Sequence, residues 1–386
     1  MSEVSPRPAG TGSVSGEDPR PARDGSGPAR DGSGPTRDGS AIAWDGSAIA
    51  RDGSGTAQTG TGVRSDAAAG MSEDDYRGLL DIRAHAPWRI AEAAAARRRG
   101  SPLKERGQLL IIAADHPARG VLGAGNRPFA MGSRVDLLRR LCVALARPGV
   151  DGLLATPDIV EDLLLLGALE DKLVIGSMNR GGVHGAAFEF DDRFTAYDTA
   201  SILRMGLDGG KMLCRIGLDD PATATTLETC ARTITELAAH SLVAMVEPFW
   251  SRRVNGTVTH DLSAEGVIRS MHVGQGLGAT SAHTWLKIPV VAEMERVMRA
   301  TTLPTLLLGG DPTGAPQETY AAWRDALGLP GVRGLVVGRA LLYPSDDDVA
   351  AAVDTAAAML EVTVNERARR HGAETSHLDG PGEELR

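Results

Sequence analysis

The sequence is poor in cysteine and has no excess of positive charge. Its three cysteines, Cys142, Cys214 and Cys230, show no C-x-x-C spacing among the 386 residues. This cysteine usage suits the reducing cytosol. The net charge at pH 7 is −9, which excludes a general electrostatic attraction to nucleic acid or to an anionic membrane surface. We therefore expect no nucleic acid and no membrane as a partner.

Long apolar runs are also missing. The chain has no stretch of about 18 consecutive apolar residues, whereas a membrane-spanning helix needs about 20. The N-terminus lacks the apolar core of a secretory signal peptide. Together with the cysteine usage, these absences predict a cytoplasmic protein.

Apolar residues are scarce at both ends of the chain. Residues 1–70 carry a degenerate seven-residue repeat, ARDGSGP, ARDGSGP, TRDGSAI, AWDGSAI and ARDGSGT. Glycine and proline exclude a helix there, and so few apolar residues cannot form a core, so we predict a disordered arm. Residues 366–386 are polar and are predicted to be a flexible tail. An N-terminal helix is expected within residues 71–104, mainly over 73–99, and one large domain over 105–365.

Short apolar runs alternate with helical patterns throughout this domain, as at 133–146 and 221–240. Continuous apolar runs are typical of parallel strands that are buried on both faces. Eight strand–helix units in about 250 residues predict an α/β fold, a (β/α)8 TIM barrel. A doubly wound open sheet is the alternative, but no G-x-G-x-x-G motif follows the first strand. The predicted strands cover residues 108–116, 149–157, 172–178, 209–217, 241–249, 284–291, 304–311 and 332–342.

Polar residues stand where several of these apolar runs end. Asp115 and His116 end the first run, Lys211 lies in the fourth, Glu247 ends the fifth and Lys287 lies in the sixth. Because the active sites of such barrels lie at the carboxyl ends of the strands, these residues are expected to meet at one mouth. Asp115, Lys211, Glu247 and Lys287 are therefore the candidate catalytic residues.

Lys287 interrupts the apolar strand TWLKIPVV. A buried ammonium group is costly, and burial next to a second cation, Lys211, favours the neutral amine, which is a nucleophile toward carbonyls. Lys287 is thus a candidate Schiff-base lysine, with Glu247 and Asp115 as acid and base groups. The alternatives are a strand-end lysine whose head reaches water, a loop-capping role for Asp115, and a purely structural Glu247–Lys211 ion pair.

His116 is a candidate metal ligand, because aldol chemistry also has metal-dependent versions. No second histidine lies at ligand spacing, and neither H-x-H nor H-E-x-x-H occurs. We therefore expect no metal and no other cofactor.

Glycines follow the seventh and eighth predicted strands. Gly309 and Gly310 precede Asp311, and Gly338 precedes Arg339. Barrels often bind phosphate between these two loops, and an arginine adds a charge-assisted contact. We predict an anion site there. The alternatives are that the glycines only permit tight turns, or that Asp311 and Arg339 bind substrate hydroxyls.

At the level of motifs, residues 105–345 resemble the class I aldolases of the DeoC/LacD group, especially the tagatose-bisphosphate aldolase branch. AADHPARG is similar to the first-strand segment of that branch, GGKMLCRI to its fourth-strand Val-Lys segment and VEPF to its Leu-Glu-Pro element. IRSMHVGQGLGATSAHTWLKIPVV resembles its helix and Lys-Val-Glu-Val-Pro strand, and VVGRALL its Gly-Arg-Ala phosphate segment. Similar actinobacterial proteins are often named deoxyribose-phosphate aldolase.

The resemblance implies a metal-independent class I aldolase of carbohydrate metabolism, with Lys287 at the Schiff-base position and Lys211, Glu247 and Asp115 at polar active-site positions. The expected substrate is a phosphorylated sugar or sugar acid, and a homo-oligomer is expected. A phosphosugar isomerase or lyase that uses Glu247 and Asp115 as acid and base is the first alternative. A non-catalytic barrel that senses a metabolite is the second.

Overall fold

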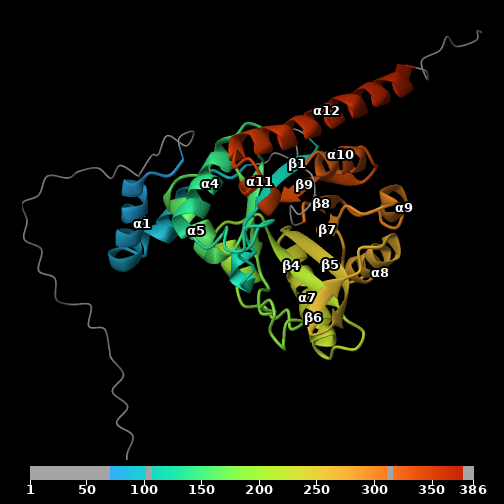
Figure 1. Cartoon of the computed structure of the whole chain (residues 1–386), viewed down its shortest axis with the longest axis horizontal. Helices are drawn as coiled ribbons and strands as arrows, with labels where there is room; N and C mark the ends of the chain where they lie inside the picture. Colours follow the sequence, from blue (N-terminus) through green and yellow to red (C-terminus); the bar gives the residue numbers. More distant parts are fainter. Residues whose placement is uncertain (1–69, 101–106, 311–315, 377–386) are drawn as a thin grey trace, which may run out of the picture. The chain divides into compact units, whose positions relative to one another are not determined.

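The computed structural model of the protein describes residues 70–100, 107–310 and 316–376 (Figure 1). The predicted repeat arm, apart from residue 70, and Asp311 lie outside these residues. Among the helices described, none combines the length and the apolar content that crossing a bilayer requires.

A closed barrel of eight parallel strands forms the centre of the protein (Figure 1). The strands follow one another in chain order around the barrel, and pairing of β4 with β5 closes the ring. Each of the eight predicted runs overlaps one of these strands, so the predicted (β/α)8 barrel is confirmed. The barrel strands are β1 (Leu109–Ala113), β2 (Gly152–Ala155), β3 (Leu173–Ser177), β4 (Gly209–Ile216), β5 (Val243–Val254), β7 (Thr284–Pro289), β8 (Thr305–Leu308) and β9 (Val332–Val337).

Helices surround the barrel and cover its outer face. Alternate strand residues, such as Leu110 and Ile112 of β1, face outward into one large apolar core shared with the helices. Serine caps begin two of the helices: Ser133 Oγ accepts from the N–H of Asp136 at 3.2 Å, and Ser263 Oγ from that of Gly266 at 3.1 Å. The helices after β1 are α4 (Arg134–Ala146), α5 (Pro157–Leu165), α6 (Thr199–Arg204), α7 (Ala222–Ala239), α8 (Ala264–Gln275), α9 (Met294–Met298), α10 (Pro316–Leu327), α11 (Arg339–Leu342) and α12 (Val349–Ser376).

The N-terminal segment differs from its prediction. The single helix predicted over 73–99 is wrong, because the chain forms α1 (Glu73–His85) and α2 (Arg89–Ala96) with Pro87 between them. Ala86 leaves the helical region at φ −142°, as expected for a residue before proline. Beyond α2, Arg97 donates to the carbonyls of Lys172 (2.8 Å) and Gly206 (2.7 Å), which precede β3 and β4. This part of the chain therefore lies against the amino-terminal end of the barrel.

Two further boundaries differ from the sequence prediction. Strand β5 continues beyond the predicted end and pairs with an antiparallel strand, β6 (Thr257–His260). Asn255 and Gly256 form the turn of this hairpin with φ of +50° and +83°, the left-handed pair that a two-residue hairpin favours. The predicted tail boundary at residue 366 is wrong, because α12 continues to Ser376.

Candidate active site

The side chains inside the barrel change from apolar to polar along the strands. Ile111, Ile175, Met245 and Leu306 belong to a separate apolar cluster in the barrel interior. Because strand side chains alternate, residues two or four positions further on along several strands face the same interior, nearer the carboxyl ends. We call this set the polar layer. It consists of Asp115, Ser177, Lys211, Glu247 and Lys287, all of them buried.

Lys287 lies inside the barrel and is 3% exposed. Its Nζ forms an ion pair with Glu247 Oε1 at 2.7 Å. Burial lowers the pKa of Lys287, and the cation of Arg180 lowers it further, although Glu247 partly opposes both effects. The alternative of a lysine head that reaches water therefore does not describe Lys287, and its neutral amine is favoured more than that of an exposed lysine.

Glu247 lies between the two lysines of the polar layer. Its second carboxylate oxygen forms an ion pair with Lys211. Burial by itself would raise the pKa of Glu247, but the charges of Lys211, Lys287 and Arg180 outweigh burial and hold the pKa well below its usual range. Glu247 is thus an ionised carboxylate that links both amines.

Lys211 extends the same chain of contacts toward the first strand. It is 1% exposed, and its Nζ lies 3.2 Å from Asp115 Oδ2. Burial lowers the pKa of Lys211 well below its usual value, and Arg180 and Lys287 add to this effect while Glu247 opposes it. Continuous contacts therefore join Asp115, Lys211, Glu247 and Lys287, which the sequence placed at one mouth.

Ser177, a member of the polar layer, and Arg180, which lies outside it, both contact Asp115. Ser177 Oγ donates to Asp115 Oδ2 at 3.0 Å, and Arg180 forms an ion pair with the same oxygen. Arg180 also donates from Nε to Ser177 Oγ at 3.0 Å. Burial lowers the pKa of Arg180 to about 10. Neither residue was predicted, because Arg180 lies on a loop without periodicity and Ser177 reads as an ordinary small strand residue.

The charges of this site do not balance when every group is ionised. Two lysines and Arg180 face two carboxylates, Asp115 and Glu247, in a region that is almost closed to water. Burial of one excess positive charge is expensive, and release of one proton from a lysine removes it. The arrangement therefore favours one neutral amine beside an ionised carboxylate.

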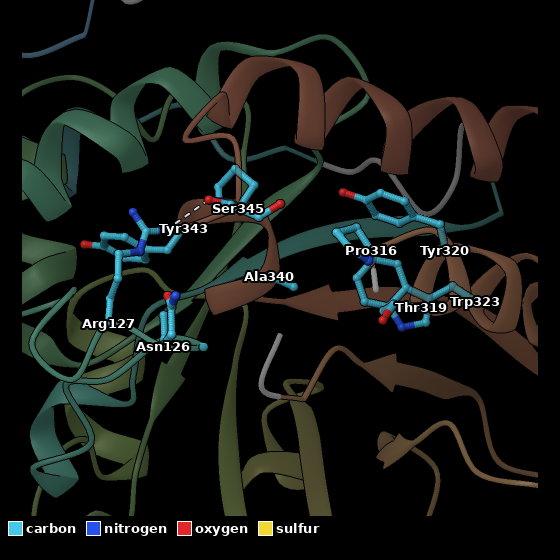
Figure 2. A pocket seen from close by; sticks show the side chains of 12 residues that line it. Asn126, Arg127, Pro316, Thr319, Tyr320, Trp323, Ala340, Tyr343 and Ser345 are labelled. Atoms are coloured by element: carbon cyan, nitrogen blue, oxygen red, sulfur yellow. Dashed lines mark hydrogen bonds between the residues drawn. The ribbon is translucent and has the colours of Figure 1, made fainter. Parts of the chain in front are cut away.

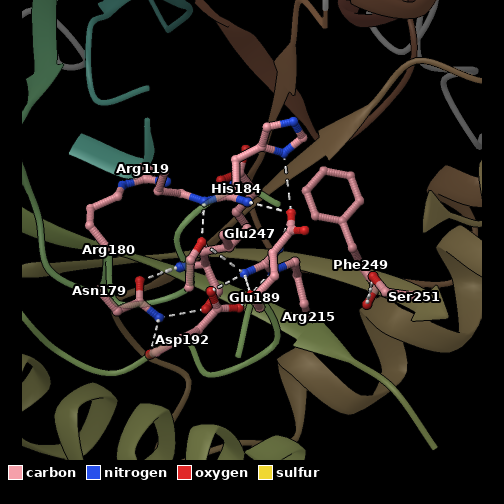
Figure 3. Close-up of polar contacts among 12 residues, drawn as sticks. Arg119, Asn179, Arg180, His184, Glu189, Asp192, Arg215, Glu247, Phe249 and Ser251 are labelled. Atoms are coloured by element: carbon pink, nitrogen blue, oxygen red, sulfur yellow. Dashed lines mark hydrogen bonds and ion pairs between the residues drawn. The ribbon is translucent and has the colours of Figure 1, made fainter. Parts of the chain in front are cut away.

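A second polar cluster holds the loop that carries Arg180 (Figure 3). Arg215, which follows Lys211 along β4, donates from Nε to Asp192 Oδ2 at 2.9 Å and pairs with Glu189. Arg119 donates from Nε to the carbonyl of Gly182 at 3.1 Å. These contacts attach residues 178–198 to β4 and to the segment after β1. We call Arg119, Glu189, Asp192 and Arg215 the loop-anchoring cluster.

His116 and Arg339 lie at the rim of the polar layer. His116 Nδ1 lies 3.7 Å from Asp115 Oδ1, which is longer than a hydrogen bond. Arg339 begins α11, and its Nη1 lies 3.4 Å from the carbonyl of Gly123. Within the described ranges, no group of three or more His, Cys, Asp or Glu side chains is arranged to hold a metal ion.

The predicted anion-binding glycines have packing roles of their own. A Cβ on Gly338 would lie 2.3 Å from the carbonyl oxygen of Ala113, and one on Gly309 would lie 2.5 Å from Val337 Cγ1. Gly310 has a φ of +64° with open space beside it. Close packing explains Gly309 and Gly338, so the anion site remains a prediction that depends on Gly310 and Arg339.

A cavity of about 530 Å³ lies beside α11, outside the polar layer (Figure 2). Its lining includes Asn126, Arg127 and the ring pair Tyr320–Trp323, whose centroids are 5.5 Å apart. No residue of the polar layer lines it. The cavity is therefore separate from the four predicted catalytic side chains.

Comparison with solved structures supports the barrel assignment. A Schiff-base-forming fructose-1,6-bisphosphate aldolase is 19% identical, with a TM-score of 0.50 over 70% of this chain and 99% of that one. An archaeal fructose-1,6-bisphosphate aldolase, whose catalytic lysine is bound to the carbinolamine intermediate, is 18% identical with a TM-score of 0.50 over 71% and 99%. At these identities the likeness concerns the fold alone, and that fold is a TIM barrel.

The family follows from a closer match. Cgl0159 from Corynebacterium glutamicum is 54% identical, with a TM-score of 0.74 over 76% of this chain and 98% of that protein. The model of the Cgl0159-like family matches residues 107–357, and the chain belongs to this family. No curated protein matches the chain.

Proposed function

We propose that the protein is a class I aldolase of the DeoC/LacD type that forms a Schiff base at Lys287 and needs no metal. One observation carries the proposal: Lys287 is buried against Glu247 in a group of three cations and two carboxylates. This charge imbalance favours a neutral amine, which is the reactive form toward a carbonyl. The aldolase-like fold supports the same reaction class, as analogy.

The reaction begins at the Lys287 amine. The amine attacks the substrate carbonyl carbon to form a carbinolamine, which loses water to become an iminium ion. The iminium draws electrons from the bond between the α and β carbons of the substrate. This bond breaks, the β carbon leaves as the first carbonyl product, and an enamine remains. Protonation of the enamine and hydrolysis release the second product and restore the amine.

The groups around Lys287 control the charge on its nitrogen during these steps. Ionised Glu247 accepts a hydrogen bond from the Lys287 nitrogen and stabilises the positive charge of the iminium ion. Arg180 disfavours an ammonium at Lys287 by repulsion. Asp115, which also pairs with Arg180, forms an ion pair with Lys211. Burial and Arg180 thus favour a neutral Lys287 before reaction, and the carboxylate of Glu247 stabilises the positive charge of the iminium ion.

The substrate class follows from Arg339. We propose a phosphorylated sugar or sugar acid whose anion is bound by Arg339 and the backbone at Gly310. An arginine gives charge-assisted, two-point contact with phosphate or carboxylate.

Borohydride trapping tests the proposal. The protein is incubated with dihydroxyacetone phosphate, or with a panel of other phosphorylated ketones and aldehydes, and then with sodium borohydride. Peptide mass spectrometry should find the reduced adduct on Lys287. Lys287→Arg should abolish the adduct, whereas the matched Lys211→Arg should slow trapping and leave the adduct on Lys287.

Three results would count against this proposal. An adduct on Lys211 would assign the imine to the other amine. No adduct with any carbonyl compound that the enzyme cleaves would favour the isomerase or lyase alternative. Loss of activity with EDTA, restored by a divalent metal, would indicate metal-dependent chemistry.

A further inference from the structure

Carbon–carbon cleavage needs a base that the polar layer does not readily supply. In the cleavage direction a proton must leave the substrate hydroxyl on the carbon beyond the bond that breaks. Asp115 Oδ2 already receives Ser177, Lys211 and Arg180, whereas Asp115 Oδ1 has no hydrogen-bond partner among the described residues and lies 3.7 Å from His116 Nδ1. Both oxygens of Glu247 are occupied by ion pairs with lysines. A carboxylate whose oxygens are occupied by cations is poorly placed to accept a proton from the substrate.

His116 is differently placed. Its Nδ1 is buried and has no hydrogen-bond partner in the described part of the structure. The side chain as a whole is 28% exposed, so the exposure belongs to its other atoms. One nitrogen of the imidazole is therefore buried beside Asp115, while the rest of the side chain is partly exposed.

The groups around His116 come from several strands. Asp115 precedes it on the first strand, Arg339 follows β9, Lys287 lies on β7, Glu247 on β5 and Lys211 on β4. Burial lowers the pKa of His116 well below its usual value, and Arg339 and Lys287 lower it further, against Glu247. The neutral ring has one nitrogen that accepts a proton and one that donates a hydrogen bond.

We propose that His116 transfers the substrate proton in the aldol step, a role that rests on the proposed imine at Lys287. In cleavage, the imidazole takes the proton of the substrate hydroxyl, and the O–H electrons form the new carbonyl. The carbon–carbon bond breaks, its electron pair forms the enamine double bond, and the iminium electrons return to the Lys287 nitrogen.

The same residue then completes the proton balance. After the carbonyl product leaves, the imidazolium delivers its proton to the enamine carbon, and the iminium forms again for hydrolysis. The proton that left the hydroxyl thus ends on carbon, and no further reactant is needed. This shuttle makes His116 a catalytic residue and leaves Asp115 as a residue that positions Lys211.

The test separates imine formation from proton transfer. His116→Asn and His116→Gly are compared with His240→Asn, a control at an exposed position after α7. Trapping of dihydroxyacetone phosphate, or of whichever ketone of the panel traps on Lys287, should persist in all three variants. Exchange of the probe's carbon-bound hydrogen with D₂O should fall roughly 10²–10⁴-fold in the His116 variants, and kcat for cleavage should fall with it.

Chemical rescue supplies a measurement that a structural role would not change. Added imidazole should restore exchange in His116→Gly, which leaves space for the ring, and should leave His240→Asn unchanged. Exchange and cleavage at the wild-type rate in both His116 variants would overturn the role of His116. Absence of trapping in the wild-type protein would instead remove the imine, and with it the proposed function.

Discussion

The two ends of the barrel interior are built from the same strands and have opposite character. Toward the amino ends, Ile111, Ile175, Met245 and Leu306 fill the interior with apolar side chains. Toward the carboxyl ends, the interior is filled by the charged side chains of the polar layer, which are also buried. The apolar end stabilises the fold by removing side chains from water, whereas the charged end is stable only through its mutual pairing. The side chains that stabilise the fold and those proposed to carry out the reaction therefore lie at opposite ends of the barrel interior.

The largest effect is expected from a change in the polar layer that leaves the apolar end intact. Lys287→Met should lower kcat/KM by roughly 10⁴-fold or more, because no other step replaces a lost imine. It should change the urea midpoint of unfolding little, because Glu247 still pairs with Lys211. In the variant two cations, Lys211 and Arg180, face two carboxylates, Asp115 and Glu247.

The contrast between the two ends would fail if Lys287→Met unfolded at a much lower urea concentration than the wild-type protein. Removal of one partner from a buried ion pair usually costs about 3–5 kcal/mol, because the other charge is left unpaired. Such a loss would show that Glu247 depends on Lys287 and that the polar layer is also a stability element.

A change at the apolar end should act in the opposite way. Ile111 is fully buried, and Ile111→Ala should reduce the free energy of unfolding by about 2–5 kcal/mol through lost burial and a remaining cavity. The folded fraction should still be trapped on Lys287 at the wild-type rate. Urea unfolding and borohydride trapping on the same samples measure both quantities. A trapping rate that falls with stability would mean that the two ends are coupled.

Alternation along the strands explains why much of the site could be predicted. Asp115, Lys211, Glu247 and Lys287 each interrupt or end an apolar run, and strand ends meet at one face in any parallel barrel. The structure brings these residues into one chain of contacts, as expected. Their catalytic roles stay predictions until an imine is trapped.

Residues that act through loops could not be found in this way. Arg180 lies in the long connection between β3 and α6, where no periodicity links it to Asp115. Its position depends on the loop-anchoring cluster, whose members are far apart in the sequence. The break at Pro87 and the Asn255-Gly256 hairpin, in contrast, carried local signals that the sequence prediction did not use.

Arg180 also offers a way to shift the pH dependence of the polar layer. Arg180→Met removes a cation that lowers the pKa of both Lys287 and Lys211, so both pKa values should rise. More lysine is then protonated at neutral pH, and the rise of trapping rate with pH should move to higher pH. Arg193→Met, on an exposed side chain of the same loop, is the matched control.

The linkage to stability has a defined sign. A lysine with a lowered pKa in the folded state binds fewer protons there than in the unfolded chain. The contribution of this lysine to the free energy of unfolding therefore rises as the pH increases from the lysine's pKa in the folded protein to its usual pKa of 10.5. Because Arg180→Met raises the pKa of the lysine in the folded protein, it narrows the pH range between that pKa and 10.5. The urea midpoint of the variant should therefore depend less on pH in this range. An unchanged trapping profile would show that Arg180 does not control the lysines.

The smallest predicted effect compares two arginines at opposite ends of β9. Arg339 follows the carboxyl end of the strand, and Arg333 lies at its amino end. If Arg339 binds the substrate anion, Arg339→Ala should remove a charge-assisted contact worth about 1.5–3 kcal/mol, which corresponds to about tenfold to a hundredfold in kcat/KM. KM should carry most of the change, because the contact forms before the chemical step. Arg333→Ala should leave kcat/KM unchanged, since it lies at the end without the polar layer. Matched phosphorylated and free sugars measure the difference: equal kcat/KM for the two would remove the anion site and would leave the chemistry at Lys287 untouched.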